Sequence, residues 1–125
     1  MTSTPDNFVV WTEIPVTDLQ RAIKFYNQVF NTELKLDETG PNPMAIFPTA
    51  NETGVAGHLY PGTPARDGTG STIHMIVPDQ LEAALERVTT AGGEVQSDPI
   101  AIPPGRFAYC RDLDGNSIGL FSYTR

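Results

Sequence analysis

The sequence FVVWTEIPVTDLQRAIKFYNQVF occupies residues 8–30 and reads as one strand followed by one helix. Residues 8–15 are apolar and β-branched, which favours a strand. From Leu19 onward the apolar residues recur at intervals of three and four, which predicts the buried face of a helix. Asp18 stands just before this stripe, where its carboxylate can accept hydrogen bonds from the free N–H groups of the first turn. Asn31 marks the expected end of the helix.

The same pattern returns about 62 residues later, so the chain contains an internal repeat. Residues 71–77 predict a second strand, and the apolar stripe in residues 81–88 predicts a second helix. Asp79 and Glu82 have the spacing of a capping box, in which two side chains bond the free N–H groups at a helix start. The glycine pair at 92–93 is typical of a helix end, since glycine easily adopts the left-handed conformation found there.

Short strands follow each helix and are separated by turn-forming residues. They are expected at residues 33–37, 44–47 and 54–60 in the first unit, and at 94–96, 106–111 and 117–123 in the second. Residues 61–70 lack periodicity and read as a linker, and residues 99–105 are expected to form a loop. The prediction is one domain over residues 1–125, with a first module at 8–60 and a second at 71–123. Each module has the order β-α-β-β-β, and the two are expected to pair because one alone could not cover its sheet.

Composition and charge limit the classes of molecule that the protein is expected to bind. The 125 residues are enough for one domain with its own core. Acidic residues outnumber basic ones, 15 to 8, and the net charge of −7 argues against binding to nucleic acid or to an anionic membrane surface. Cys110 is the single cysteine, so a disulfide within the chain is excluded, and we expect a buried, inert thiol. Neither a signal peptide nor an apolar run of about 18 residues is found, so we expect a soluble cytoplasmic protein without a membrane span.

Two motifs stand near the two ends of the chain. The first is PVTDL at residues 15–19, which is followed by Phe25 and Tyr26. The second is DLDGN at residues 112–116, a strong turn sequence with Leu113 between its two aspartates. In this order and spacing they resemble the vicinal oxygen chelate superfamily, which includes glyoxalase I, bleomycin-resistance proteins and extradiol dioxygenases. The resemblance implies an α+β fold in which two tandem βαβββ modules form a cupped mixed sheet.

The resemblance also implies a metal site with two ligands from each module. The four corresponding positions carry Trp11, Gly57, Thr72 and Gly119. An indole donates only an N–H, glycine has no side chain and threonine is a weak ligand, so these positions do not fit a metal. We therefore expect no metal and no cofactor there, although a divalent metal remains possible two residues further along the strands.

Glu13 and His74 follow the first and third of these positions by two residues. Residues two apart on a strand share a face, so we expect both side chains to point into the cup. Four roles stay open for the pair: a structural contact, a grip on a ligand, general acid–base catalysis and weak metal binding. His58 adjoins Gly57 and therefore has the opposite parity, so it is expected to point away from the cup.

Several residues are expected to line the cup and contact a ligand. Trp11 is either a filler of the core or an aromatic platform for a flat or cationic molecule. Gly57 and Gly119 are expected to leave space opposite Trp11. Leu59 and Phe121 are expected to point to the same inner face of the cup. Arg106 could receive an anionic group at the mouth of the cup. The predicted ligand-binding set is Trp11, Met44, Gly57, Thr72, Arg106, Gly119 and Phe121.

Taken with the resemblance, the sequence favours a metal-free protein that binds a small molecule in the cup between its modules, as bleomycin-resistance proteins do. The alternative is an enzyme of the family, a lyase, isomerase or dioxygenase, in which Glu13 and His74 form a shifted site. A third interpretation is a subunit whose cup holds no ligand and which serves assembly. The resemblance also implies a homodimer. Whether the cup lies within one chain or is shared by two stays open.

Overall fold

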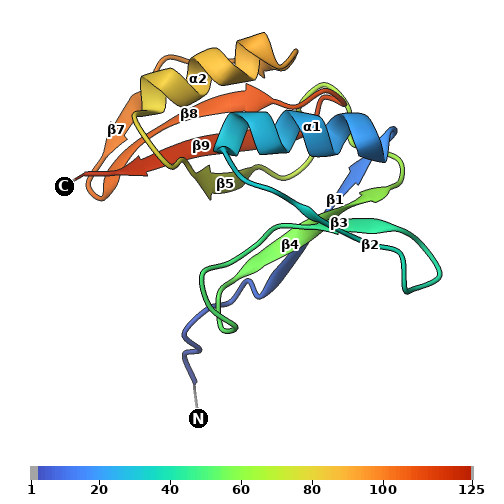
Figure 1. The fold of residues 1–125 in the computed structure, drawn as a ribbon. Coiled ribbons are helices and arrows are strands. Elements are labelled where there is room, and N and C mark those ends of the chain that lie inside the picture. Colours follow the sequence, from blue (N-terminus) through green and yellow to red (C-terminus); the bar gives the residue numbers. More distant parts are fainter. Residues whose placement is uncertain (1–2, 125) are drawn as a thin grey trace.

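The computed structural model describes residues 3–124, so residues 1, 2 and 125 of the predicted domain lie outside it (Figure 1). The first module contains β1 (Trp11–Val16), α1 (Leu19–Phe30), β2 (Lys35–Asp37), β3 (Met44–Ile46) and β4 (Ala56–Pro61). The second contains β5 (Ile73–Ile76), α2 (Leu81–Thr90), β6 (Glu94–Val95), β7 (Ile100–Ile102), β8 (Gly105–Arg111) and β9 (Ser117–Tyr123).

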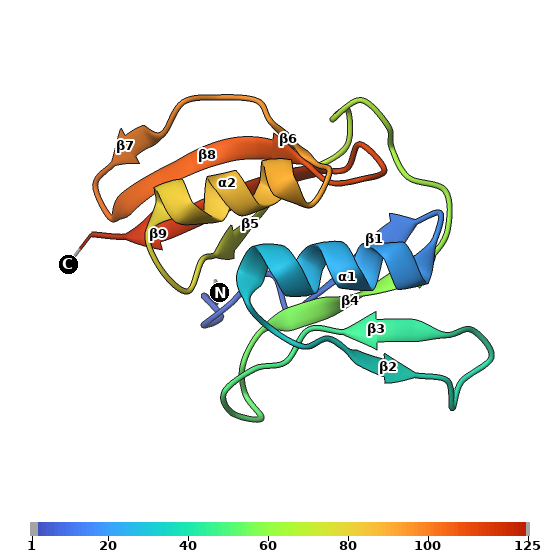
Figure 2. The ribbon, with the colours of Figure 1, turned by 45° about the horizontal axis from the view of Figure 1, so that its top comes forward.

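Each module forms its own mixed sheet. In sheet A the strand order is β1-β4-β3-β2, with β1 parallel to β4 and the other pairs antiparallel. In sheet B the order is β5-β9-β8-β6, with β5 parallel to β9, and β7 pairs with β8. One helix packs on each sheet, and Figure 2 shows α1 and α2 side by side. The α+β class with two tandem modules is thus confirmed.

Helix α1 begins and ends where the sequence predicts. Asp18 is its N-cap, and the carboxylate accepts a hydrogen bond from the Arg21 N–H at 3.1 Å. Asn31 closes it in the left-handed conformation, with a φ of 49°. The apolar stripe is buried over sheet A, with Phe25 and Tyr26 at 2% and 0% exposure. Burial of this stripe supplies most of the stability of such a helix.

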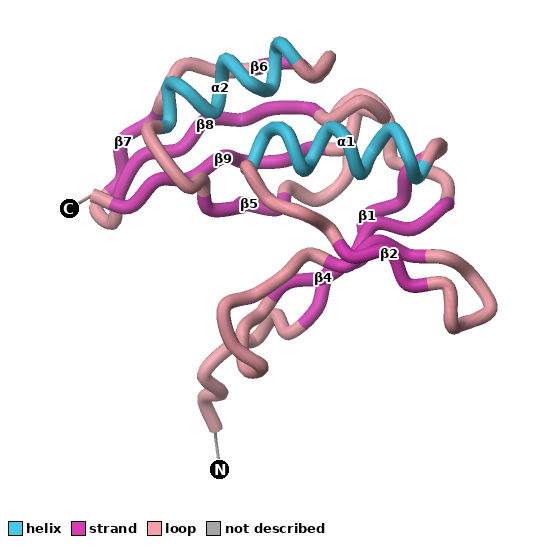
Figure 3. The backbone as a smooth tube through the Cα atoms, viewed as in Figure 1, coloured by secondary structure: helices cyan, strands magenta, loops and turns pink. Residues whose placement is uncertain are grey.

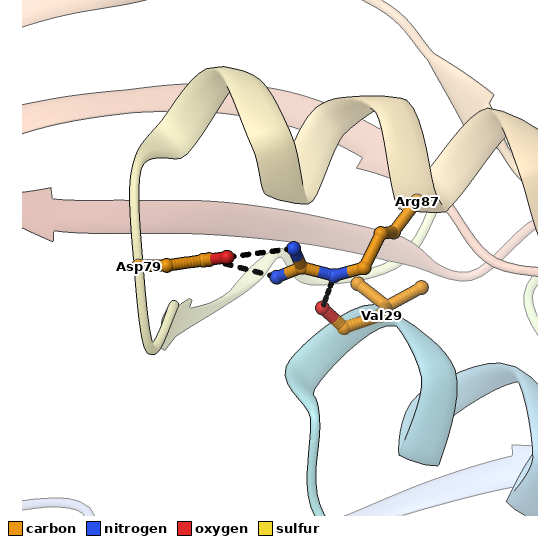
Figure 4. Close-up of polar contacts among 3 residues, drawn as sticks. All are labelled: Val29, Asp79 and Arg87. Carbon is orange, nitrogen blue, oxygen red and sulfur yellow. Dashed lines mark hydrogen bonds and ion pairs between the residues drawn. The ribbon is translucent and has the colours of Figure 1, made fainter.

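The start of α2 differs from the predicted capping box. Its N-cap is Gln80, without a capping side-chain bond, because the Asp79 carboxylate is held by Arg87 through two hydrogen bonds of 2.8 Å. The Arg87 Nε also donates to the Val29 carbonyl at 2.9 Å (Figure 4). This carbonyl is among those at the end of α1 that lack a partner within the helix. Arg87 therefore ties the start of α2 to the end of α1.

The turn between β8 and β9 holds the two modules together. Asp112, which is 5% exposed, accepts a 2.7 Å hydrogen bond from the buried Tyr26 hydroxyl of α1. Asn116 donates its side-chain amide to the Pro15 carbonyl at 2.8 Å. Asp114 accepts from the hydroxyl of Thr17. The DLDGN motif thus makes a hairpin turn, as predicted, and also joins this turn to the first module.

Strand β7 lies where the sequence predicts a loop. Ile100 pairs with Phe107, and the chain turns back through two prolines before β8. All three residues of β7 are exposed, so no buried face appears in the pattern. The flanking prolines are tolerated because β7 is an edge strand, so the N–H group that a proline lacks is not needed to pair with a further strand.

Strands β1 and β5 each form one edge of their sheet, and the opposite edges belong to β2 in sheet A and β6 in sheet B (Figure 3). The predicted first strand begins at Phe8, but β1 begins at Trp11, and residues 8–10 lie outside the sheet with 59–86% exposure. Within residues 3–124, helices are too short or too polar to span a membrane.

Candidate functional site

Each sheet has a face covered by its helix and a face without a helix, which we call its open face. In β1, Ile14 and Val16 are buried beneath α1, so Trp11 and Glu13 lie on the open face of sheet A. Glu13 is paired in register with His58 of β4. Since residues paired in register share a face, His58 also lies on this open face.

Trp11, His58 and Glu13 form a connected group. The Trp11 indole N–H donates to His58 Nδ1 at 2.9 Å, and His58 Nε2 lies 3.3 Å from Glu13 Oε1. A nitrogen that accepts a hydrogen bond carries no proton, so His58 is the neutral tautomer with its proton on Nε2. The expectation that His58 lies on the face opposite to Trp11 and Glu13 is therefore wrong. Trp11 does not fill the core, because it remains 48% exposed.

The open face of sheet B is rich in aromatic rings. The His74 ring packs edge-on against Phe107, with ring centres 5.0 Å apart, and lies 5.9 Å from Tyr109. His74 is paired in register with Gly119, and a Cβ there would overlap the imidazole. Gly119 therefore makes room for His74 rather than for a ligand. The Thr72 hydroxyl forms a hydrogen bond with the Ser117 hydroxyl.

Glu13 and His74 are not brought together within the chain. Glu13 contacts His58, whereas His74 packs among the aromatic rings of sheet B. Among residues 3–124, clusters of three His, Cys, Asp or Glu that could hold a metal are absent. The four positions that the resemblance assigns to metal ligands do not offer suitable donor atoms either, so we derive no chemistry through a metal.

A cavity of about 1010 Å³ lies between the modules. The first module contributes the helix side of sheet A and the end of α1, through residues such as Thr12, Phe30, Phe47 and Gly57. The second module contributes His74, Ile76, Phe121 and Tyr123. We call this space the intermodule cavity.

The walls of the intermodule cavity are mostly apolar and carry no Asp, Glu, Lys or Arg side chain of residues 3–124. The lining residues with polar side chains are His74, Tyr123 and three threonines. An apolar wall with few polar groups is typical of small-molecule sites. Charged ligands would lose their hydration there without gaining an opposite charge, so the lining favours a neutral molecule.

Of the predicted ligand-binding residues, Gly57 and Phe121 line this cavity. Arg106 lies outside this cavity, and its guanidinium binds Glu82 of α2 at 2.7 and 3.0 Å. This contact lowers the pKa of Glu82 to about 2. Leu59 was expected on the inner face but is fully buried beneath α1.

The other predicted ligand-binding residues, Trp11, Met44, Thr72 and Gly119, also lie outside the wall of this cavity. Met44 is half-buried and alternates with the buried Ala45, so it lies on the open face of sheet A. Cys110 is buried as expected, and its burial raises the pKa of the thiol to about 11.

Phe30, Phe47 and Ile76 also line the cavity, which was not predicted from the sequence. Phe30 belongs to the apolar stripe of α1, and its place at the last turn gave no sign of a second role. Ile76 is 57% exposed on β5, for which the sequence predicted a strand without indicating which side chains are exposed. An exposed apolar residue in such a strand can only be recognised once the packing of the modules is known.

Comparisons with known proteins agree on one family. Residues 8–120 match the family model described as the Glyoxalase/Bleomycin resistance protein/Dioxygenase superfamily. A glyoxylase-like domain-containing protein from Didymella fabae is 31% identical over 113 residues, covering 84% of this chain and 85% of its own length.

Two solved structures show the same fold. A glyoxalase/bleomycin resistance protein from Albidiferax ferrireducens T118 superimposes with a TM-score of 0.73 at 19% identity, covering 94% of this chain and all of its own. TnmS3, an antibiotic binding protein from Streptomyces sp. CB03234, superimposes with a TM-score of 0.63 at 24% identity, covering 98% of this chain and all of its own.

Proposed function

Since the chain belongs to the Glyoxalase/Bleomycin resistance protein/Dioxygenase superfamily, we propose that it binds a small, neutral, largely apolar molecule in the intermodule cavity. The observation that carries the proposal is the cavity itself, about 1010 Å³ between the two modules with a wall free of charged side chains in the described chain. This volume lies at the upper end of the range of ligand sites. A fold neighbour named as an antibiotic binding protein supports this class of function.

The polar groups of the cavity would orient such a ligand. The His74 imidazole offers one donor and one acceptor, and Tyr123 offers a hydroxyl. Phe30, Phe47 and Phe121 supply apolar surface on both sides. A neutral molecule with an aromatic or alicyclic body and one or two carbonyl or hydroxyl groups matches this arrangement.

A neutral fluorescent dye tests the proposal. N-phenyl-1-naphthylamine, whose emission rises in apolar surroundings, is expected to bind saturably with one molecule per chain. Thr32→Phe places a ring at the cavity wall and is expected to weaken binding by about tenfold or more. Thr63→Phe makes the same change at an exposed position outside the cavity and should leave the affinity unchanged. Equal affinities of both variants, or no saturable binding, would contradict the proposal.

We also propose that the protein forms a homodimer. β1 and β5 are unpaired along one edge, and the neighbouring residues 8–10 are exposed and apolar. Exposed strand edges of this kind favour pairing with another chain. Light scattering is expected to give twice the chain mass of 13.6 kDa, with Val10→Lys shifting the mass toward one chain. Leu36→Lys, on the opposite edge of sheet A, should leave the dimer intact, and a monomeric wild-type protein would refute this part.

A further inference from the structure

We propose that the protein has a second ligand site, for a small neutral molecule with several hydroxyl groups, such as a monosaccharide. The site is a cavity of about 610 Å³ near the start of α2 and the end of β9, which we call the terminal cavity. Its wall is formed by residues 76–80, Arg106 and residues 122–124. It shares Tyr123 and residues 76–78 with the intermodule cavity, but its polar residues are its own. This volume lies within the range of known small-molecule sites, about 300–1,000 Å³.

The terminal cavity forms because β5 ends before its neighbour β9. Ile76, the last residue of β5, pairs with Phe121, and the Val77 N–H donates to the Phe121 carbonyl at 2.9 Å. The chain then leaves the sheet toward α2, whereas β9 continues to Tyr123. Because β8 pairs with the other side of β9, the end of β9 is left with the cavity on the side of β5.

The two charged residues of this wall are each neutralised by a partner. Arg106 binds Glu82 through hydrogen bonds of 2.7 and 3.0 Å, and Asp79 is bound by Arg87 through two of 2.8 Å (Figure 4). Two parallel bonds of this kind also hold both side chains in fixed positions. A charged ligand would have to compete with these pairs, so the wall favours a neutral molecule.

Unused hydrogen-bonding groups remain on the same wall. A guanidinium has five N–H donors, of which Arg106 uses two for Glu82. Gln80 is the N-cap of α2, but its side chain makes no capping bond, so its amide keeps two donors and an acceptor oxygen. Ser122 is paired in register with Arg106, so its hydroxyl lies on the same face of sheet B. Hydroxyl groups both donate and accept, so a polyol is suited to all three side chains.

Tyr123 supplies an apolar surface beside these polar groups. It is 57% exposed, and its ring packs edge-to-face against Phe121 with ring centres 4.8 Å apart. A sugar ring carries C–H groups on its flat faces and hydroxyl groups around its rim. Such a ring can pack on the tyrosine while its hydroxyl groups bond to the polar wall. A purely apolar molecule would instead leave the polar groups of this wall without partners.

An NMR titration with methyl β-D-glucopyranoside tests this proposal. The glucoside is a neutral ring with hydroxyl groups, and 2-methoxytetrahydropyran is an analogue that keeps the ring and the methoxy group without any hydroxyl. The glucoside is expected to shift the side-chain N–H signals of Gln80 and Arg106 saturably, with one molecule bound per chain. The analogue is expected to bind at least about tenfold more weakly, because it cannot replace the hydrogen bonds of the wall to water.

Matched variants locate the site. Gln80→Leu removes the side-chain amide at similar size and is expected to weaken glucoside binding about threefold or more, as is Ser122→Ala. Gln20→Leu makes the same change at an exposed position on α1, outside both cavities, and should leave the affinity unchanged. Far-UV circular dichroism and the Tm of each variant establish that it is folded.

Three results would overturn this proposal: no saturable binding of the glucoside, equal binding of the analogue without hydroxyl groups, or unchanged affinity in both Gln80→Leu and Ser122→Ala. Each of them leaves the proposed function intact if N-phenyl-1-naphthylamine still binds and Thr32→Phe still weakens it. Absence of dye binding together with intact glucoside binding would contradict the proposed function alone.

Discussion

A buried hydrogen bond between Tyr26 and Asp112 joins the two modules. The tyrosine is fully buried, and its hydroxyl lies 2.7 Å from a carboxylate oxygen. Burial, followed by the charge of Asp112, raises the pKa of Tyr26 well above its usual value, so the hydroxyl remains a donor throughout the physiological range. Without this donor, Asp112 would keep only its hydrogen bonds from Asn116 and the Asp114 N–H. A hydrogen bond to a charged group contributes about 1.5–3 kcal/mol.

Tyr26→Phe is therefore expected to lower the free energy of unfolding by about 1–3 kcal/mol, measured by urea denaturation. Tyr60→Phe is the matched control, because Tyr60 is half-buried and its hydroxyl has no hydrogen bond among the described residues. Equal stability of the two variants would mean that the Tyr26 bond contributes little to joining the modules.

The sheet face on which each site residue lies could be predicted from the sequence only in part. The face of Glu13 was predictable from strand alternation, but the face of His58 depends on the register between β1 and β4. The resemblance placed Trp11 and Gly57 on the same face of the sheet, whereas the structure pairs Trp11 with Ala56 and Gly57 with Thr12, on the other face. A slip of one residue moves every side chain to the other face, so this small error reversed the assignment of His58.

The surface of α2 is fixed by two arginine contacts. Arg87 holds Asp79 near its start, and Arg106 of β8 holds Glu82 in its first turn. The helix itself was predictable from its apolar period, but its cap was not. Arg87, eight residues further along the chain, binds the Asp79 carboxylate instead. The spacing between Asp79 and Glu82 does not reveal this competing contact.

The Glu82 contact predicts a pH dependence. Hydrogen bonding by Arg106 lowers the pKa of Glu82 from 4.5 to about 2. A lowered pKa in the folded state means that the stabilisation is complete above pH 4.5 and is lost as the pH falls toward about 2. The Tm difference between wild type and Glu82→Gln should therefore be constant from neutral pH to about 5 and vanish near pH 2. A constant difference down to pH 2, or the same trend in Glu86→Gln, would contradict this account.

At the scale of the whole molecule, the contact between the modules creates the cavity. The two helices pack together, the DLDGN turn bonds to the first module, and the open face of sheet B then lies across the helix side of sheet A. The modules and their order were predictable from the repeat. Their relative placement was not, because it depends on contacts such as Tyr26 to Asp112 that join residues 86 positions apart.

The central claim is that a neutral ligand binds between the modules, and NMR tests it most directly. The single tryptophan gives one indole N–H signal, and the two histidines give separate imidazole signals. Addition of N-phenyl-1-naphthylamine is expected to shift the signals of His74 and Phe121, which line the cavity, and to leave the Trp11 indole signal in place. Shifts confined to Trp11 and His58, or no shifts at saturating dye, would contradict the claim.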